Sequence, residues 1–215
     1  PHSPMMIGDE FYNKFKDLDP AMKHRDPKKE DVMMTRAALA MCENIDWNVG
    51  RVLKKLDELK LRDNTIVLYF CDNGPNSWRW NAGMKGRKSS VDEGGLRSPL
   101  HIRWPARIKP GTKVAQVSAA IDLLPSLAGL AGIATKSAKP LDGRSFGPLL
   151  FDESARLPAR DLFSVWRKRS TVRTERFRLD SAGRLYDIHN DRGQTKDVSK
   201  KHPQETARLR KALTE

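Results

Sequence analysis

Asp72 and Asn73 are the residues of this 215-residue sequence that most directly suggest a chemical role, the binding of a cation. They follow the apolar run Thr65–Cys71 and stand before Gly74 and Pro75, which favour a turn. A carboxylate beside an amide carbonyl is an all-oxygen pair, the kind of donor set that Ca²⁺ and Mg²⁺ prefer. Asp-Asn-Gly is also a common turn sequence, so the pair by itself indicates either a cation site or a plain turn.

A basic, glycine-rich segment lies between Gly83 and Pro99, with Lys88 near its middle. A lysine ammonium is a compact charge that can hold an oxygen of a sulfate or phosphate group beside a cation. A solvated basic loop is an equally good interpretation of this segment taken alone. His2 stands among prolines, which favour an extended loop, and by itself it indicates a surface histidine.

Trp78, Arg79 and Trp80 come soon after the Asp-Asn pair. Indole faces stack on sugar rings, and a guanidinium pairs with anionic substituents. The segment therefore predicts a substrate-binding loop for a sulfated carbohydrate. A packing role for the two tryptophans is the alternative.

Rigid elements must position these residues, and the sequence predicts a helix followed by a strand. Apolar residues recur every three or four positions within Glu30–Leu61, which indicates a helix with one apolar face. The run Thr65–Cys71 has no polar alternation, which is typical of a strand buried on both faces of a parallel sheet. In open α/β sheets, ligands bind beyond the carboxyl ends of strands, which is where Asp72 and Asn73 fall.

The rest of the chain divides into a region of mixed strands and helices and a region of short strands with one final helix. We expect strands at Ser98–Trp104 and Val114–Ser118, then a helix at Leu123–Leu130 with Asp122 as its N-cap. After Phe151 the sequence predicts four short strands and a final helix, at Leu162–Trp166, Thr171–Thr174, Arg176–Leu179, Leu185–Ile188 and Pro203–Leu213. The expected fold class is α/β, with residues 1–150 as one part and residues 151–215 as a small antiparallel sheet plus a helix.

Taken in order, these motifs resemble the sulfatase family of the alkaline phosphatase-like superfamily. The resemblance covers nearly the whole chain. The segments that carry it are Pro1–Pro4, Ile45–Arg51, Asp63–Gly74, Gly86–Lys88, Glu93–Pro99, Arg103–Pro105, Asp122–Leu127, Leu141–Ser145 and Leu185–Pro203. It implies that residues 1–150 are the C-terminal part of an α/β sandwich catalytic domain.

The resemblance also implies a reaction, the hydrolysis of a sulfate ester. Family members use a formylglycine, made from Cys or Ser, whose hydrated form attacks sulfur beside a divalent cation, usually Ca²⁺ with Mg²⁺ as the alternative. On this basis Asp72 and Asn73 match metal ligands, and Lys88 matches the lysine that contacts the sulfate. His2 matches the histidine that binds the sulfate and assists the leaving oxygen.

One part of the family pattern is absent. Neither Cys42 nor Cys71 stands in a Cys/Ser-x-Pro/Ala-x-Arg motif, so both are expected to be buried thiols. We therefore expect the chain to be the C-terminal portion of a sulfatase, inactive by itself, with the N-terminal half of the catalytic domain as its partner. The family further implies a sulfated carbohydrate or aryl sulfate as substrate, and a periplasmic or secreted location.

The charge of the chain leaves other functions open. The formal net charge is +13, and residues 154–178 contain eight Lys or Arg against two acids, which indicates a basic surface or a polyanion-binding face. No zinc-finger spacing, aromatic RNA-binding signature or basic zipper is present, so no nucleic-acid partner is expected. No apolar run approaches the roughly 18–20 residues of a membrane span.

Two alternatives to a sulfatase remain from the sequence. A phosphodiesterase or phosphonate hydrolase of the same superfamily would use a metal, a lysine and a histidine equally well. A non-catalytic polyanion-binding module would explain the positive charge and the absent nucleophile, and its affinity for polyanions would depend on salt but not on Ca²⁺.

Overall fold

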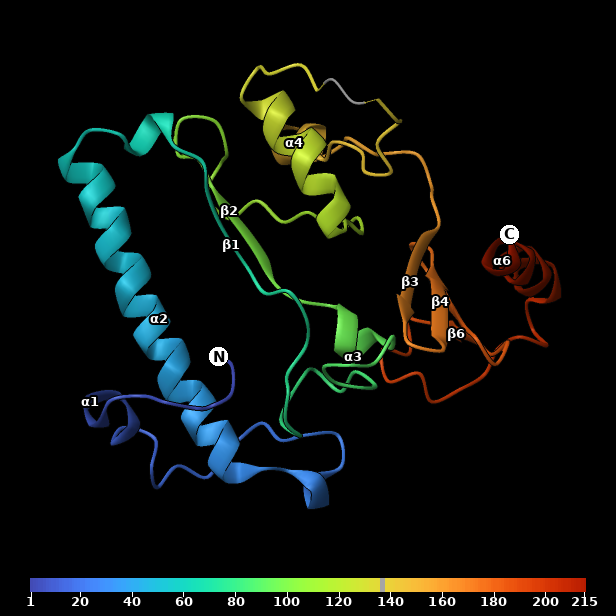
Figure 1. Cartoon of the computed structure of the whole chain (residues 1–215), viewed down its shortest axis with the longest axis horizontal. Helices are drawn as coiled ribbons and strands as arrows, with labels where there is room; N and C mark the ends of the chain where they lie inside the picture. Colours follow the sequence, from blue (N-terminus) through green and yellow to red (C-terminus); the bar gives the residue numbers. More distant parts are fainter. Residues whose placement is uncertain (136–137) are drawn as a thin grey trace.

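A long helix and a two-stranded sheet form the first half of the computed structural model, which describes residues 1–135 and 138–215 (Figure 1). Helix α2 (Val32–Glu58) begins at Asp31, whose carboxylate accepts a hydrogen bond from the backbone N–H of Met34 at 3.1 Å. Such a cap satisfies a donor that the first helical turn leaves open. The predicted helix is thus confirmed, with Asp31 as its start.

Strand β1 (Val67–Phe70) pairs antiparallel with β2 (Leu100–Arg103), with Phe70 opposite Leu100. The prediction of a strand buried on both faces of a parallel sheet is wrong for the described residues. Three residues of β1 are half-buried, and the side chain of Phe70 is 49% exposed. The reason is that β2 is its one hydrogen-bonded neighbour in the described sheet, and an antiparallel pair can leave a face open.

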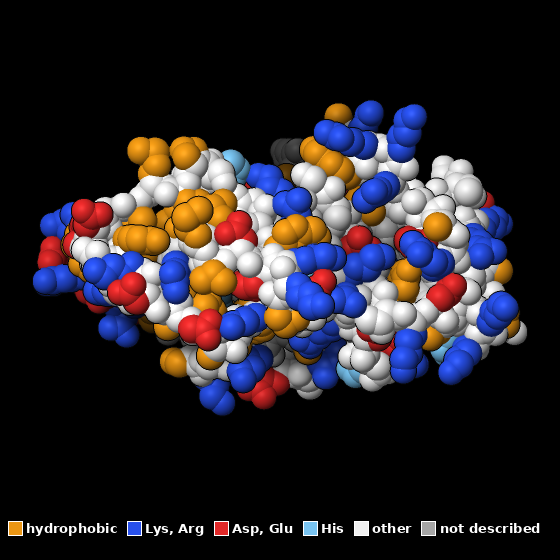
Figure 2. Space-filling model, turned by 90° about the horizontal axis from the view of Figure 1, so that it is seen from below, with side chains coloured by type: hydrophobic (Ala, Val, Ile, Leu, Met, Phe, Trp, Pro, Cys, Tyr) orange, Lys and Arg blue, Asp and Glu red, His pale blue; other side chains and the backbone are white. Residues whose placement is uncertain are grey.

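The apolar face of α2 is also only partly covered. Its buried residues lie in its first third, at Thr35, Ala37, Ala38 and Ala40. Farther along, Val52 and Leu59 are 56% and 55% exposed. Figure 2 shows hydrophobic side chains gathered over one part of the surface, on the side where α2 and β1 lie. An apolar stripe of this kind normally faces another element.

A second group of helices packs around a small apolar core. Helices α4 (Leu123–Leu130) and α5 (Gly147–Phe151) contribute to it, together with Ile102 of β2. Its buried members are Phe146, Leu149 and Leu150. The predicted helix at α4 is confirmed.

Asp122 has a different role from the one expected. Its side chain makes no cap for α4 but accepts hydrogen bonds from the backbone N–H of Ala119 and Arg144 and pairs with the guanidinium of Arg160. Burial raises the pKa of the Asp122 carboxyl, and these hydrogen bonds outweigh it, so that the pKa lies below its usual range. The carboxylate therefore joins three segments of the chain.

Residues 114–118 form no strand, and this prediction is wrong. The polar groups of the segment are bonded to side chains and to non-strand backbone instead of to a neighbouring strand. The Gln116 amide exchanges two hydrogen bonds with the backbone of Leu157, and the N–H of Val117 donates to the Glu175 carboxylate. A strand needs a backbone partner, and none lies beside this segment in the described residues.

The last part of the chain is a four-stranded antiparallel sheet backed by a helix. The strands lie in the order β3-β4-β5-β6, and α6 (Pro203–Thr214) packs on β4 and β5. Their bounds are Leu162–Trp166, Arg169–Arg173, Phe177–Asp180 and Leu185–Asp187. The core between sheet and helix consists of residues that are 0% exposed: Val172, Leu179, Leu185 and Leu209. Each of these predicted elements is confirmed.

The remaining helical turns are short. They are α1 (Asp9–Tyr12), α3 (Glu93–Leu96) and the 3₁₀ turns Pro27–Lys29, Arg62–Asn64 and Ala120–Asp122. Among the described residues, no helix is both long enough and apolar enough to cross a membrane. Figure 1 shows α3 between the β1–β2 ribbon and the four-stranded sheet, so this short helix lies where the two halves of the chain meet.

Candidate functional site

His2 and Lys88 lie side by side although 86 residues separate them in the chain. The ammonium Nζ of Lys88 is 2.8 Å from Nε2 of the His2 imidazole. The other ring nitrogen, Nδ1, is 2.6 Å from the backbone carbonyl oxygen of Ser3. An ammonium only donates, so this network assigns the proton to Nδ1 and the lone pair to Nε2. The two residues that the sequence analysis singled out for sulfate binding therefore converge.

Contacts from the turn after β1 hold both of these residues. The amide of Asn76 donates to the hydroxyl of Ser3 at 2.8 Å, which fastens the segment that contains His2. The backbone N–H of Lys88 donates to the carbonyl oxygen of Pro75 at 2.8 Å. Both segments are thus anchored within a few residues of the Asp-Asn pair.

Gly74 allows the closest approach in this region. Its N–H donates to the carbonyl oxygen of Gly95 at 2.9 Å. A Cβ atom at position 74 would lie 1.8 Å from the carbonyl oxygen of Gly94, a distance that no packing tolerates. The turn that contains the Asp-Asn pair and the segment around α3 therefore meet backbone to backbone.

Asp72 is exposed at the end of β1, and the Asn73 amide nitrogen donates to its Oδ1 at 2.6 Å. Within the described residues, the Asp72 carboxylate makes no ion pair with a cationic side chain. An unneutralised carboxylate beside an amide oxygen fits a hard cation, provided the Asn73 side chain turns its oxygen toward the ion. No group of three or more His, Cys, Asp or Glu suited to a metal occurs in the described part of the chain, so a full ligand shell needs further donors.

The three predicted binding residues in the loop after the Asp-Asn pair differ in how exposed they are. Trp78 is half-buried between cationic and aromatic neighbours: the Arg87 guanidinium lies 4.7 Å from its ring centroid and the His24 ring 5.1 Å away. These contacts favour the packing alternative for Trp78. The side chain of Trp80 is 47% exposed and open to a ligand.

Arg79 lies between these two tryptophans and is half-buried. Its guanidinium donates to the hydroxyl of Ser77 at 2.9 Å and to the amide oxygen of Asn76 at 3.3 Å. Burial lowers the pKa of this guanidinium, and nearby carboxylates act in the opposite direction. Two hydrogen bonds leave donors of the guanidinium free for an anionic group.

The site region contains a buried ion cluster that sequence reasoning missed. Glu93 is 3% exposed, and its carboxylate contacts Nη2 of Arg178 at 2.9 Å and Nε of Arg173 at 3.4 Å. Burial raises the pKa of the Glu93 carboxyl, and the two arginines outweigh it, so that the pKa lies below its usual range. The sequence predicts a basic surface that includes both arginines, yet Arg178 is only 4% exposed and Arg173 only 7%. The one feature of the sequence that could have pointed to this cluster is a glutamate followed by two glycines.

The two cysteines are free thiols, and their burial differs from the expectation. Cys42 is exposed, so the prediction of a buried thiol is wrong there, and Cys71 is half-buried. Cys42 lies in α2 just beyond Ala40, the last buried residue of this helix.

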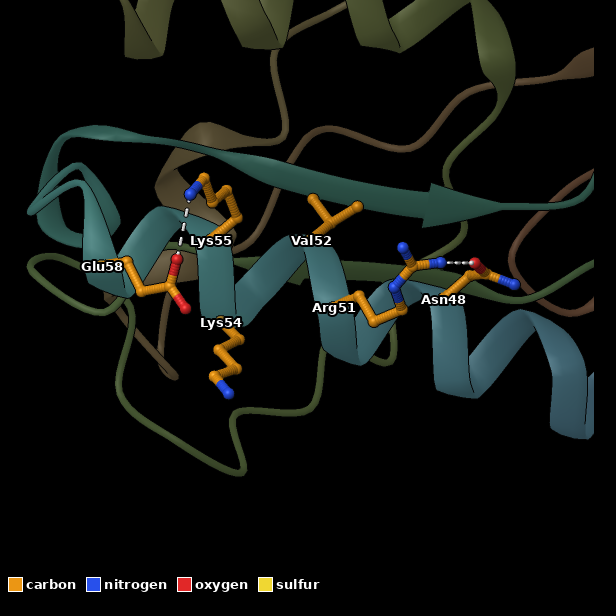
Figure 3. A pocket seen from close by; sticks show the side chains of 6 residues that line it. All are labelled: Asn48, Arg51, Val52, Lys54, Lys55 and Glu58. Carbon is orange, nitrogen blue, oxygen red and sulfur yellow. Dashed lines mark hydrogen bonds and ion pairs between the residues drawn. The ribbon is translucent and has the colours of Figure 1, made fainter.

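A hollow of about 590 Å³ lies on α2, away from all of these residues. Its lining comes from one helix, and Figure 3 shows that the side chains of Lys55 and Glu58 pair with each other, as do those of Arg51 and Asn48. The side chains that line this hollow do not point toward a common centre, in contrast to those of His2 and Lys88, which meet. It is a feature of the uncovered helix surface.

Two family models match the chain. The model described as "Sulfatase" matches residues 1–133, and the model described as "N-sulphoglucosamine sulphohydrolase, C-terminal" matches residues 87–215. Steryl-sulfatase of Mus musculus is 37% identical over 131 residues, which are 56% of this chain and 21% of that protein. The chain thus spans about a fifth of the length of this relative.

Solved structures show the same fold. Ps i-CgsB, in complex with k-i-k-neocarrahexaose, superposes with a TM-score of 0.83 at 22% identity, covering all of this chain and 47% of that one. A second structure, in complex with its substrate D-glucosamine-2-N,6-O-disulfate, has a TM-score of 0.64 at 24% identity, covering 94% of this chain and 43% of that one. At these identities the likeness establishes the fold, which is that of the alkaline phosphatase-like domains of sulfatases.

Proposed function

Because this chain belongs to the sulfatase family, we propose that it takes part in the hydrolysis of a sulfate ester on a carbohydrate. The observation that carries the proposal is the 2.8 Å contact between Lys88 and His2, anchored within a few residues of Asp72 and Asn73. In this proposal an ammonium, an imidazole and two oxygen donors act on the same sulfate group. A sulfate group needs such partners, since its charge lies on oxygens.

Lys88 binds the sulfate group in this proposal. Its ammonium has three donors, and one of them already reaches Nε2 of His2. The others are free to hold sulfate oxygens, and the charge on these oxygens grows as the ester bond breaks. Lys88 therefore stabilises the transition state more than the bound ester.

His2 handles the proton at the leaving oxygen. When the S–O bond of the ester breaks, the sugar oxygen must gain a proton. Nε2 accepts a hydrogen bond from Lys88 in this structure, so it must first exchange that hydrogen bond for a proton from solvent. The resulting imidazolium can then donate this proton from Nε2 to the sugar oxygen. The hydrogen bond from Nδ1 to the carbonyl of Ser3 keeps the ring oriented for this transfer.

Asp72 and Asn73 would hold a divalent cation, with Ca²⁺ as the first choice and Mg²⁺ as the alternative. Such a cation supplies positive charge to the sulfate oxygens when bound. A formylglycine does not fit the residues present, because neither Cys42 nor Cys71 stands in the required motif. The nucleophilic step is therefore not assigned to this chain.

The remaining expectations form part of the same proposal. The N-terminal half of a sulfatase catalytic domain would supply the nucleophile and cover the exposed apolar surface of α2 and β1. Residues 1–150 would complete that domain, and residues 151–215 would form the small subdomain. A sulfated carbohydrate as substrate is supported by the exposed Trp80, and secretion or periplasmic export is the family expectation.

The test is the turnover of a sulfated monosaccharide and of an aryl sulfate with added Ca²⁺. We expect none from the chain alone and clear turnover when a segment that contains the nucleophile motif is co-expressed with it. Metal-dependent turnover by the isolated chain would contradict the need for a partner. Faster turnover of a phosphonate monoester, or Ca²⁺-independent binding of heparin without turnover, would favour one of the alternative functions.

A further inference from the structure

The loop that contains Lys88 is fastened from outside by the C-terminal sheet. Its last part, α3, begins with Glu93, whose buried carboxylate pairs with Arg173 of β4 and Arg178 of β5. These two arginines are directly opposite each other in the β4–β5 ladder. A second group of Arg178, Nη1, donates to the carbonyl oxygen of Val91 at 2.9 Å. The sheet therefore contacts the loop at two points, the carboxylate of Glu93 and the carbonyl oxygen of Val91.

A second contact joins the same loop to the turn after β6. The amide oxygen of Gln194 accepts a hydrogen bond from the N–H of Glu93 at 2.9 Å, and its amide nitrogen donates to Asp92 at 3.1 Å. The Gln194 side chain is 5% exposed. The ammonium of Lys85 also pairs with Asp92, at 3.2 Å. Both ends of the segment 85–93 are therefore held.

These contacts continue to the proposed sulfate site through the backbone. The N–H of Gly94 donates to the carbonyl oxygen of Lys85 at 2.7 Å, which closes the loop. The carbonyl oxygen of Gly95 accepts from the N–H of Gly74, next to the Asp-Asn pair. Backbone hydrogen bonds therefore connect the segment that begins at Glu93 both to the start of the Lys88 loop and to the turn after β1.

The loop needs external support because its backbone is not relaxed. Ser89, next to Lys88, has a φ of 69°. A residue with a side chain adopts positive φ only when its surroundings impose it. In addition, loss of the Glu93 charge would leave two nearly buried guanidiniums without their carboxylate, which is costly.

We propose that Glu93, with Arg173, Arg178 and Gln194, positions Lys88 and thereby makes the C-terminal sheet part of the sulfate site. Glu93 is a positioning residue, since it touches neither the His2–Lys88 pair nor the Asp-Asn pair. The role in sulfate binding rests on the proposed function. The control of the loop by the sheet does not, so the two can be tested separately.

The experiment is backbone hydrogen exchange of the 215-residue chain, measured peptide by peptide, for Glu93→Gln. We expect exchange in residues 84–92 and 72–75 to become faster by about tenfold or more, while β4 and β5 keep the exchange of the wild type. The matched control is Arg184→Gln, which removes an ion pair within the same sheet, to Asp180, without a contact to the loop. It should leave both segments unchanged.

A second variant covers the case in which Glu93→Gln does not fold. Gln194→Leu removes the contacts to Asp92 and to the N–H of Glu93 without removing the buried charge pair, and the same local pattern is expected. Sulfate affinity, measured by titration at equal thermal midpoints, should fall with the loop protection. Uniform acceleration across the chain, or unchanged exchange in residues 84–92 in both variants, would overturn the proposal. Altered loop exchange in a chain that never binds sulfate would instead contradict the proposed function alone.

Discussion

At the scale of single residues, the site depends on a few close contacts between distant parts of the chain. Sequence reasoning identified His2 and Lys88 through a family resemblance, and the structure brings them to 2.8 Å. It did not identify the role of Glu93, because the basic segment also contains Asp92 and the glycines after Glu93 do not show which carboxylate is buried. Pairing with two arginines that lie about 80 residues later can only be seen in three dimensions.

The close approach at Gly74 leads to a prediction about stability. Gly74→Ala should lower the free energy of unfolding by about 1–3 kcal/mol, because the new Cβ would meet the carbonyl oxygen of Gly94 at 1.8 Å and force the backbones apart. Denaturant unfolding measures this change. The matched control is Gly50→Ala in α2, where nothing lies within 4 Å of the added atom and a gain of about 0.5–1 kcal/mol is expected. Equal effects at both positions would contradict the described geometry.

At the scale of elements, local patterns predicted helices and strands well and their burial poorly. The helix α2, the strand β2 and all four strands of the C-terminal sheet follow from periodicity and turn residues. Whether β1 is covered on both faces depends on neighbours that no local pattern specifies. Residues 114–118 show the same limit, since Gln116 and Val117 bond to side-chain or non-strand backbone groups far along the chain.

The C-terminal sheet leads to a prediction about pH. Burial, and then the nearby Asp180 carboxylate, raise the pKa of Tyr186 on β6 to about 12. An unfolded tyrosine ionises near pH 10 and the folded one near pH 12, so the unfolded state binds fewer protons between these values. Stability should therefore fall as the pH rises from 10 to 12.

Two measurements check this expectation. Absorbance at 295 nm should show a component that ionises near pH 12 in the wild type and is missing in Tyr186→Phe. The fall in unfolding free energy across that range should be smaller in the variant. A Tyr186 that ionises near pH 10 would contradict the burial of this side chain.

At the scale of the whole molecule, two regions differ in how completely the chain buries its own apolar residues. The C-terminal sheet and α6 enclose a core whose members are 0% exposed. Around α2 and β1, by contrast, large apolar side chains are about half exposed, among them Trp47, Val52 and Phe70. Alternation and helical period showed where these residues are but not what covers them. The exposed face supports the proposal that a further part of a sulfatase domain packs there.

Incomplete burial around β1 also bears on the proposed cation site, which the described residues specify only in part. Asp72 and Asn73 offer two oxygen donors, whereas Ca²⁺ takes six to eight. The sequence could point to these two from their place after a strand. It could not show that the described residues contain no group of three or more His, Cys, Asp or Glu suited to a metal.

In the proposed site, Lys88, His2 and the Asp-Asn pair bind one sulfate ester beside a cation. The most direct measurement is calorimetric binding of a 6-sulfated glucosamine to the chain with Ca²⁺, for the wild type, Lys88→Met and the exposed control Lys54→Met. Loss of a charge-assisted hydrogen bond should weaken binding by about tenfold or more in Lys88→Met, and chelation of Ca²⁺ should do the same. Lys54→Met should bind as the wild type does. Equal affinity of the wild type and Lys88→Met, with or without Ca²⁺, would contradict the account.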